Sequence, residues 1–118
     1  VPMVCEPFAL EGLAQLMQTV KKVKRAANKD LQLMGIVFTM LDRRLLASNE
    51  IMRDIKRTFP SDVIFKTEIP RNVRITEAQS HGEPIIFYDK NSKGADTYKR
   101  LSKEVLEKVR EMERRNEQ

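Results

Sequence analysis

Two short segments of the sequence combine cationic side chains with residues that restrict the backbone, and they are the best candidates for chemistry. They read TMLDRR at 39–44 and TEIPRNVR at 67–74. In the first, Asp42 precedes Arg43 and Arg44 where a strand is expected to pass into a helix, and backbone N–H and guanidinium groups at such a junction favour an anion. A helix-capping aspartate followed by two solvated arginines is an equally good interpretation, and the residues alone leave both open.

The second segment is the stronger candidate for contact with a phosphate-bearing partner. Pro70 fixes its own φ and pushes Ile69 towards extended geometry, so the chain leaves the expected strand along a defined path. Arg71 and Arg74 are three residues apart, and on a helical turn their guanidinium groups would project from neighbouring positions suited to phosphate oxygens. Because a rigid loop and two cations coincide, a functional role for the segment 67–82 is favoured over a merely solvated turn.

Other residue types give weaker signals. His81 has no second histidine or cysteine nearby, so a turn histidine is a better interpretation than a metal ligand. Ser80, His81 and Asp89 could form a hydrolase triad only without the usual glycine pattern around the serine. Neither G-x-x-x-x-G-K-[ST] nor G-x-G-x-x-G occurs, and the 4 glycines stand apart at 12, 35, 82 and 94. We therefore expect that this chain alone does not hydrolyse a nucleotide.

The composition indicates one globular domain with a basic surface. With 118 residues, 41% of them hydrophobic and 33% charged, the chain is long enough for one core. The formal net charge of +5 favours nucleic acid or another anionic surface without choosing between them. Cys5 is the single cysteine, so no internal disulfide forms and a reducing, cytoplasmic compartment is expected. No leader pattern and no apolar run of roughly 20 residues is present, so we expect neither export nor membrane insertion.

Hydrophobic periodicity predicts alternating helices and strands. Helical spacing runs from Leu10 to Ala27, between Asp42 and Pro60, around 75–79, and from SKGA at 92–95 to Met112. The nearly unbroken apolar run at 31–40 reads as a central strand, and DVIFKTEI at 62–69 reads as a second strand. A brief apolar run follows at 83–89, and the polar tail 113–118 is expected to fray. The pattern predicts a single α/β domain over 1–118, with a mainly parallel sheet flanked by helices. The opening VPMVCE reads as the end of a strand, and half of a larger sheet is expected outside this chain.

Three stretches of the sequence carry a resemblance to a known family. They are CEPFALEGLAQL from Cys5, GIVFTMLDRR from Gly35, and KTEIPRNVRITEAQSHGEPIIFYDKNSKGADTYKRLSKEV from Lys66. Together they resemble the C-terminal half of the ParA/Soj chromosome- and plasmid-partitioning ATPases, of the MinD/ParA superfamily. The resemblance implies a P-loop NTPase, Rossmann-like fold with a deviant Walker motif. It also implies an intact protein that dimerises around ATP and Mg²⁺ and binds DNA without sequence preference. A ParB-type centromere-binding partner would stimulate its ATP hydrolysis, and the protein would lie in the bacterial cytoplasm, at the nucleoid.

The resemblance also implies roles for particular residues. The base and ribose of the nucleotide would be held by Thr39, Met40, Asp42, Ile69, Pro70, Arg71 and Asn72, whereas the phosphate- and Mg²⁺-binding half is expected elsewhere, so that this chain alone should not bind nucleotide tightly. Arg44 and Arg74 match positions implicated in DNA contact. Leu45 stands where the family commonly has threonine, so Arg43 is an alternative to Arg44 as the DNA contact. Two further positions depart from the family: Pro7 stands where members commonly have an aromatic residue, and Gln79 stands where they commonly have proline.

The charge pattern supports DNA contact independently of the resemblance. The stretch from Arg43 to Arg57 has five cations against two carboxylates, and the stretch from Lys66 to Arg74 adds three against Glu68. No recognition-helix motif is present, so contact with the phosphate backbone is expected in place of base readout. Two alternatives stay open: a MinD-like ATPase, for which the C-terminal helix offers only Val109 and Met112 as membrane anchors, and a freestanding basic nucleic-acid-binding module without catalysis.

Overall fold

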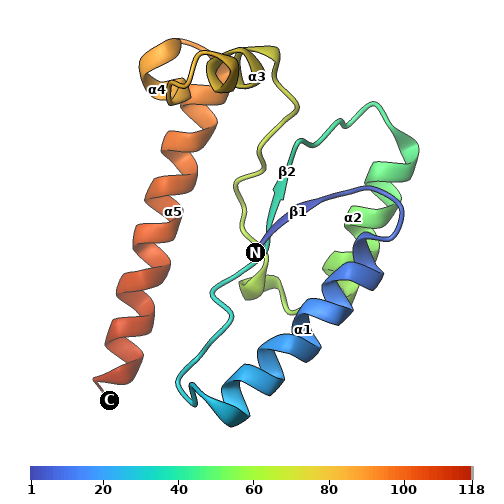
Figure 1. The fold of residues 1–118 in the computed structure, drawn as a ribbon, viewed down its shortest axis with the longest axis vertical. Helices are drawn as coiled ribbons and strands as arrows, with labels where there is room; N and C mark the ends of the chain where they lie inside the picture. Colours follow the sequence, from blue (N-terminus) through green and yellow to red (C-terminus); the bar gives the residue numbers. More distant parts are fainter. Residues whose placement is uncertain (118) are drawn as a thin grey trace.

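The computed structural model describes residues 1–117 and has an α/β architecture built on a parallel strand pair. Its elements are β1 Pro2–Val4, α1 Ala9–Ala26, β2 Val37–Thr39, α2 Leu46–Thr58, the 3-10 helix η1 Ser61–Val63, α3 Val73–Ser80, α4 Ile85–Tyr88 and α5 Lys93–Asn116. Strands β1 and β2 pair in parallel with Met3 opposite Phe38. Helices α1 and α2 lie on one side of the strands and α5 on the other (Figure 1). The predicted α/β class with a parallel sheet is confirmed.

Both predicted strands are longer in the sequence pattern than in the structure. The strand expected at 31–40 is regular only over Val37–Thr39, and the one expected at 62–69 keeps a single parallel bridge, Ile36 with Ile64. A second isolated bridge, Leu41 with Pro70, lies just after it. Ile64, Phe65 and Ile69 are nevertheless buried, which is why the apolar pattern is strand-like. Burial alone does not make a strand, because the ladder of hydrogen bonds must also continue.

The ladder is interrupted at residues 66–68. The N–H of Phe65 donates to the carbonyl of Ile36 (2.9 Å), and the carbonyl of Phe38 accepts next from Ile69 (2.8 Å), where an unbroken parallel ladder would use Thr67. The N–H groups of Lys66 and Thr67 donate instead to the carboxylate of Glu104 on α5, at 2.7 and 2.9 Å. A side chain 37 or more residues away therefore takes the donors that a regular strand would have used.

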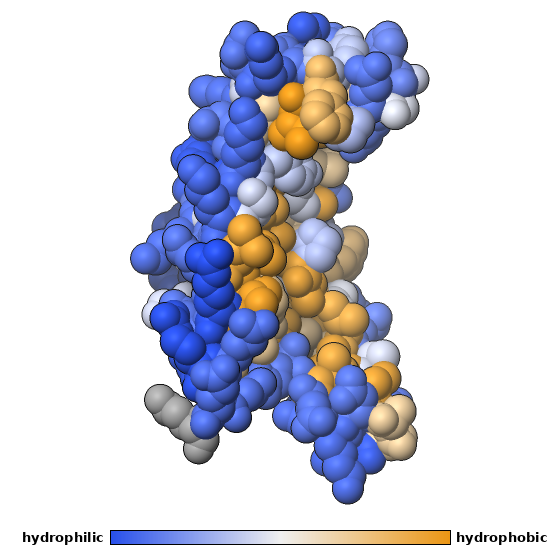
Figure 2. Space-filling model, turned by 90° about the vertical axis from the view of Figure 1, so that its left-hand side faces the viewer, coloured by the Kyte–Doolittle hydropathy of each residue, from blue (hydrophilic) through white to orange (hydrophobic). Residues whose placement is uncertain are grey.

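The hydrophobic core has two parts. The larger lies between the strands, α1 and α2, and its most deeply buried side chains are Leu13, Ile36, Phe38 and Ile55. The smaller joins α3, α4 and α5 through Ala78, Ile85 and Ala95. The radius of gyration, 16.0 Å, exceeds the about 13.5 Å of a compact chain of this length, and a band of hydrophobic side chains is visible on the α5 side (Figure 2).

The last helix is longer than its apolar stripe. It was expected to end near Met112 with a frayed tail over 113–118, but α5 continues to Asn116. Glu113, Arg114 and Arg115 are good helix formers, and the two arginines in the last turn complement the helix dipole. The helix thus extends beyond its apolar stripe, and fraying of 113–118 stays a prediction; Gln118 lies outside the described residues.

Glu104 gives the docking of α5 a pH dependence. Partial burial raises the pKa of Glu104, but the N–H groups of Lys66 and Thr67, the Thr67 side chain and the charge of Lys108 together bring that pKa below its ordinary value. Because the folded pKa is lower than the unfolded one, the stabilisation is fully present above the ordinary glutamate pKa of about 4.3 and is lost as the pH falls through the folded value.

We therefore expect Glu104→Gln to lower the free energy of unfolding by about 1 to 2 kcal/mol at neutral pH, because one charge-assisted acceptor is lost. Urea denaturation at neutral pH and below pH 4 would measure the effect, and the gap to the parent protein should narrow in acid. Glu107→Gln is the matched control, since Glu107 is exposed on the same helix. An equal loss in both variants would assign the effect to net charge alone.

Candidate functional site

The two predicted loops lie side by side, as parallel strands require. The N–H of Leu41 donates to the carbonyl of Ile69 (3.0 Å), and the N–H of Arg71 donates to the carbonyl of Leu41 (3.0 Å). Leu41 and Pro70 form a parallel bridge. The segments 39–44 and 67–74 thus leave the sheet from one edge, where ligands gather in α/β folds.

Met40 forms a bulge with a strained backbone in the first loop, just after β2. Ile69 bonds to Phe38 through its N–H and to Leu41 through its carbonyl, so one extra residue stands between the two bonds on the β2 side. Met40 takes up that residue with φ 50°, in the left-handed region that a non-glycine residue occupies only at a cost of about 1 kcal/mol or more. Met40 is 49% exposed, so about half of this residue is accessible at the strand end.

Asp42 is held by the arginine two residues on. Its Oδ1 accepts from the backbone N–H (3.1 Å) and from Nε (3.0 Å) of Arg44, and its Oδ2 accepts from Nη2 (3.0 Å). Hydrogen bonds from the Arg44 side chain first, then from its backbone, lower the pKa of Asp42 to about 2, and the charge of Arg71 adds to this. Helix α2 begins only at Leu46, so Asp42 does not cap it and the capping alternative is wrong.

Asn72 caps the next helix and separates the two arginines of the second loop. The Oδ1 of Asn72 accepts from the N–H of Arg74 at 2.9 Å, at the start of α3. Arg71 lies before this cap and Arg74 after it, so the two side chains do not share a helical face as the spacing had suggested. Arg71 is exposed and makes no salt bridge within residues 1–117.

Each arginine predicted to contact DNA is paired with carboxylates. Arg43 places Nη2 2.7 and 2.6 Å from the two carboxylate oxygens of Glu68, which ties the first loop to the second. The carbonyl of Arg43 also accepts from the side chain of Asn49 on α2 at 2.8 Å. Arg44 is paired with Asp42 while its side chain remains 88% exposed.

Arg74 has two acidic partners and an aromatic one. Its Nη1 lies 2.7 Å from Glu77 and its Nε lies 2.8 Å from Asp89, while its guanidinium carbon is 5.5 Å from the centre of the Tyr88 ring. Hydrogen bonds to Asp89 and then to Glu77 raise the pKa of Arg74, and the same Arg74 contact lowers the pKa of Asp89. The cluster therefore has two negative groups for one positive group, and a phosphate would have to compete with both.

A cavity of about 310 Å³ lies beside the two loops and is partly formed by residues that sequence reasoning missed. It contains Leu41, Arg43, Glu68 and Pro70 from the loops, and it is completed by Lys66 and by Lys93, Thr97 and Arg100 of α5. No local signal marks these α5 residues, because Lys93 and Arg100 are exposed cations like many others and Thr97 is a polar residue, although it is buried. The cavity thus brings four cations to the edge of the predicted site.

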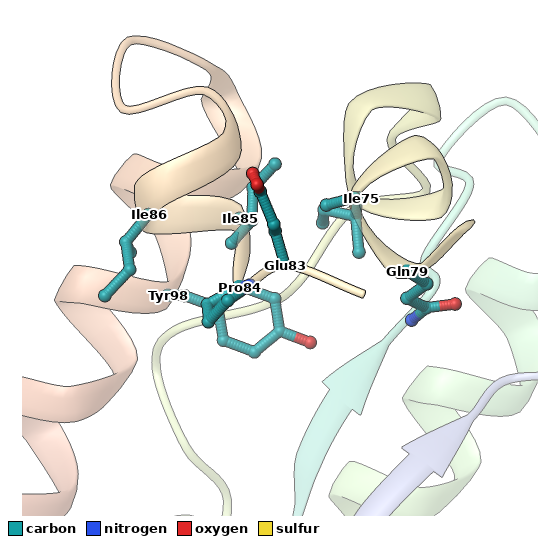
Figure 3. A pocket seen from close by; sticks show the side chains of 8 residues that line it. Ile75, Gln79, Glu83, Pro84, Ile85, Ile86 and Tyr98 are labelled. Carbon is teal, nitrogen blue, oxygen red and sulfur yellow. The ribbon is translucent and has the colours of Figure 1, made fainter. Parts of the chain in front are cut away.

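A second, more apolar cavity of about 330 Å³ lies away from the predicted site, between α3, α4 and α5. Figure 3 shows Ile75 of α3 across from Ile85 of α4, with Gln79 on the α3 side, Ile86 on the far side of α4 and the Tyr98 ring of α5 below. Pro84 and Glu83 complete the visible rim. None of the predicted site residues contributes to it.

The hydrolase triad is wrong. Asp89 is paired with Arg74, the Nδ1 of His81 lies 2.8 Å from the carbonyl of Glu77, and the hydroxyl of Ser80 donates to the carbonyl of Thr76 at 3.3 Å. Each of the three side chains therefore bonds to a different group, and none of these bonds joins two members of the triad. Across the described range 1–117, no three His, Cys, Asp or Glu side chains gather as a metal site would require.

Comparison with known proteins decides the family. The family model described as the CobQ/CobB/MinD/ParA nucleotide binding domain matches residues 5–85. The chain belongs to this family. The matched range contains all the predicted site residues and ends before α5.

The relatives of this MinD/ParA-family chain include named partitioning proteins. The sporulation initiation inhibitor protein Soj of Bacillus subtilis is 49% identical over 105 residues, which cover 89% of the chain and 41% of that protein. The chromosome partitioning protein ParA of Caulobacter vibrioides is 42% identical over 111 residues (94% and 41%), and the chromosome-partitioning ATPase Soj of Treponema pallidum is 45% identical over 106 residues (90% and 42%). The chain spans about two fifths of the length of these relatives, and the expected ParA/Soj relationship is confirmed.

Membership of a P-loop NTPase family agrees with the parallel strand pair. Within residues 1–117, no helix is both long enough and apolar enough to cross a lipid bilayer.

Proposed function

We propose that this chain is part of a Soj/ParA-type ATPase for chromosome or plasmid partitioning, in which it supplies a pocket for the adenine and ribose of ATP and a non-specific DNA-contacting surface. The observation that carries the nucleotide part is the joining of the loops at Leu41 and Pro70, beside a strained and exposed Met40. Rigid backbone with stored strain at a strand end is typical of a ligand site.

The residues present fit one end of a nucleotide. Met40 and Pro70 offer apolar surfaces for the faces of a base, and Thr39, Asp42, Ile69 and Asn72 are their neighbours along the two loops, with Ile69 contributing only backbone because its side chain is buried. Arg71 forms no salt bridge within residues 1–117. When bound, ATP with Mg²⁺ would supply the phosphoanhydride that the intact protein hydrolyses. We assign the contacts to the phosphates and Mg²⁺ to residues outside these 118, so that this chain alone is inactive and binds nucleotide weakly.

Titration of the intact protein with ADP, followed by an ATP hydrolysis assay, tests the nucleotide part. We expect saturable ADP binding and hydrolysis in the intact protein, and neither at comparable concentration in residues 1–118 alone. An intact protein that binds no adenine nucleotide would favour the freestanding basic module instead.

The DNA part of the proposal uses Arg44 and Arg74, with Arg43 as the alternative to Arg44. All three are exposed, and all three have carboxylate partners that a DNA phosphate would replace. Exposed ion pairs contribute only about 0 to 1 kcal/mol, so replacing a carboxylate partner by a DNA phosphate costs little free energy. Guanidinium contacts to the phosphate backbone carry no sequence information, and binding should be non-specific and dependent on salt.

For the DNA surface, we expect Arg74→Ala to weaken binding to unrelated duplex sequences about uniformly and to reduce the salt slope by about one unit, because one phosphate contact is lost. Fluorescence anisotropy at several salt concentrations would measure both quantities. Arg74→Lys is the matched control, since it keeps the charge and should keep the slope. Unchanged binding of Arg74→Ala at low salt would remove Arg74 from the DNA surface.

The remaining partners follow from the same proposal. We propose an ATP-dependent homodimer, stimulation by a ParB-type partner and a place at the nucleoid in the bacterial cytoplasm. A MinD-like membrane role is less well supported, because Val109 and Met112, the apolar anchors of the last helix, are half-buried.

A further inference from the structure

The C-terminal end of α1 has the strongest local excess of positive charge in the chain. Residues 21–30 contain five cations, Lys21, Lys22, Lys24, Arg25 and Lys29, against the single carboxylate of Asp30. This group of five is called the α1 basic end below. Its surplus of four charges compares with a formal net charge of +5 for all 118 residues. Nearly all the net charge of the chain is therefore concentrated here.

The α1 basic end differs from the arginines of the predicted DNA surface in its pairing. All five of its side chains are exposed, and none forms a salt bridge with any residue in the described part of the chain. Arg43, Arg44 and Arg74, by contrast, are each paired with at least one carboxylate. The positive field of the α1 basic end is thus not reduced by ion pairing, and an approaching polyanion displaces only water and counterions.

The geometry gathers these cations around one hollow. Lys21, Lys24 and Arg25 lie three and four residues apart, on one side of the helix. The N–H groups of Ala27 and Asn28 both donate to the carbonyl of Val23 at 2.9 Å, and this turn brings Lys29 to the same side. Lys21, Lys24, Arg25 and Lys29 together line a hollow of about 460 Å³.

Helix capping accounts for only part of this charge. Lys24 and Arg25 are in the last turn of α1, where a cation stabilises the helix dipole by about 0.3 to 1 kcal/mol. Lys21 and Lys22 precede that turn and Lys29 follows the helix, so they gain little from the dipole. Three of the five cations are thus left without a structural reason in the described chain.

We propose that the α1 basic end is a binding site for the phosphate backbone of nucleic acid, separate from the surface that contains Arg44 and Arg74. Helix α1 ends at the lower end of the molecule, whereas α3, the helix that contains Arg74, lies at the upper end (Figure 1). A duplex bound there makes a second contact that the paired arginines cannot supply. This proposal rests on the DNA-binding part of the proposed function.

Nucleic acid is favoured over an anionic membrane as the partner. Membrane binding by a basic helix requires an apolar face that inserts between lipids. On α1, Leu13 is buried and Met17 and Val20 are half-buried, which leaves Leu16 and Val23 as the exposed large apolar side chains, at 38% and 40%. Two partly exposed residues provide little to insert, whereas contact with phosphates needs only the cations.

The test compares two triple variants of the intact protein that remove equal charge. The first is Lys21→Gln with Lys24→Gln and Lys29→Gln. The control is Lys103→Gln with Arg110→Gln and Arg114→Gln, on α5, where the three side chains are exposed and have no salt bridge among the described residues. Thermal melts would confirm that both variants remain folded.

Anisotropy with fluorescent duplexes of unrelated sequence gives the readout. Three lost phosphate contacts at about 0.9 slope units each should reduce the salt slope by about 3 and weaken binding at least about tenfold near 100 mM salt, with a change below about threefold in the control. Equal losses in both variants, or no loss in the first, would overturn the proposal. So would binding to phosphatidylserine vesicles that depends on the α1 basic end while duplex binding does not.

Arg74→Ala in the same assay separates this proposal from the proposed function. A loss with Arg74→Ala but not with the α1 variant overturns the α1 site alone. A loss with the α1 variant but not with Arg74→Ala supports the α1 site and overturns the Arg74 surface. A parent protein that binds no duplex at low salt overturns both.

Discussion

Phe38→Ala is expected to lower the free energy of unfolding by about 3 to 5 kcal/mol, because it removes a fully buried aromatic side chain and leaves a cavity at the centre of the larger core. Phe38 lies in β2, and its carbonyl accepts the N–H of Ile69 at 2.8 Å. The ring and the backbone of this residue thus support the core and the second loop together.

Urea denaturation of the intact protein, with a fitted midpoint and slope, measures this loss. Phe87→Ala is the matched control, since the Phe87 side chain is 77% exposed on α4 and its removal should change stability by at most about 0.5 kcal/mol. A loss below about 1 kcal/mol for Phe38→Ala would mean that the core relaxes around the cavity and that Phe38 is not its centre.

Two substitutions of Met40 should distinguish a role of its side chain in nucleotide binding from the conformational cost of its left-handed backbone. Met40→Ala removes the thioether side chain and leaves the left-handed backbone of φ 50° unchanged, whereas Met40→Gly removes the side chain and relieves that conformation. If Met40 packs on the base, both variants should bind ADP about tenfold more weakly, which corresponds to about 1.4 kcal/mol of lost burial. Met40→Gly should be more stable than Met40→Ala by about 1 kcal/mol.

Calorimetric titration with ADP and thermal denaturation of the two variants would give these values in the intact protein. Leu45→Ala is the control, because Leu45 is 53% exposed close to the same loop and is not among the predicted pocket residues. ADP affinity equal to that of the parent in both Met40 variants would leave Met40 with only its role in the bulge.

Local patterns in the sequence predicted much of this protein. Apolar residues at three- and four-residue steps predicted α1, α2 and most of α5, because helix burial depends on neighbours a few positions away. The apolar runs correctly marked Ile36, Phe38 and Ile69 as buried. The positions of the two loops at one edge followed from the alternation of strands and helices, and the family resemblance was visible in the residues themselves.

The tertiary structure decided the contacts between residues distant in the chain. Glu104 takes the N–H groups of Lys66 and Thr67 and thereby ends a segment that reads as a strand. The pairing of Arg43 with Glu68 and of Arg74 with Asp89 spans 25 and 15 residues, so a count of cations alone overstated the free charge near the loops. Hydrophobic periodicity reports which side of an element is buried, but it does not report which polar group is opposite. That depends on how the packed elements place their side chains in space, and so the bulge at Met40 and the partners of the arginines were determined only by the fold.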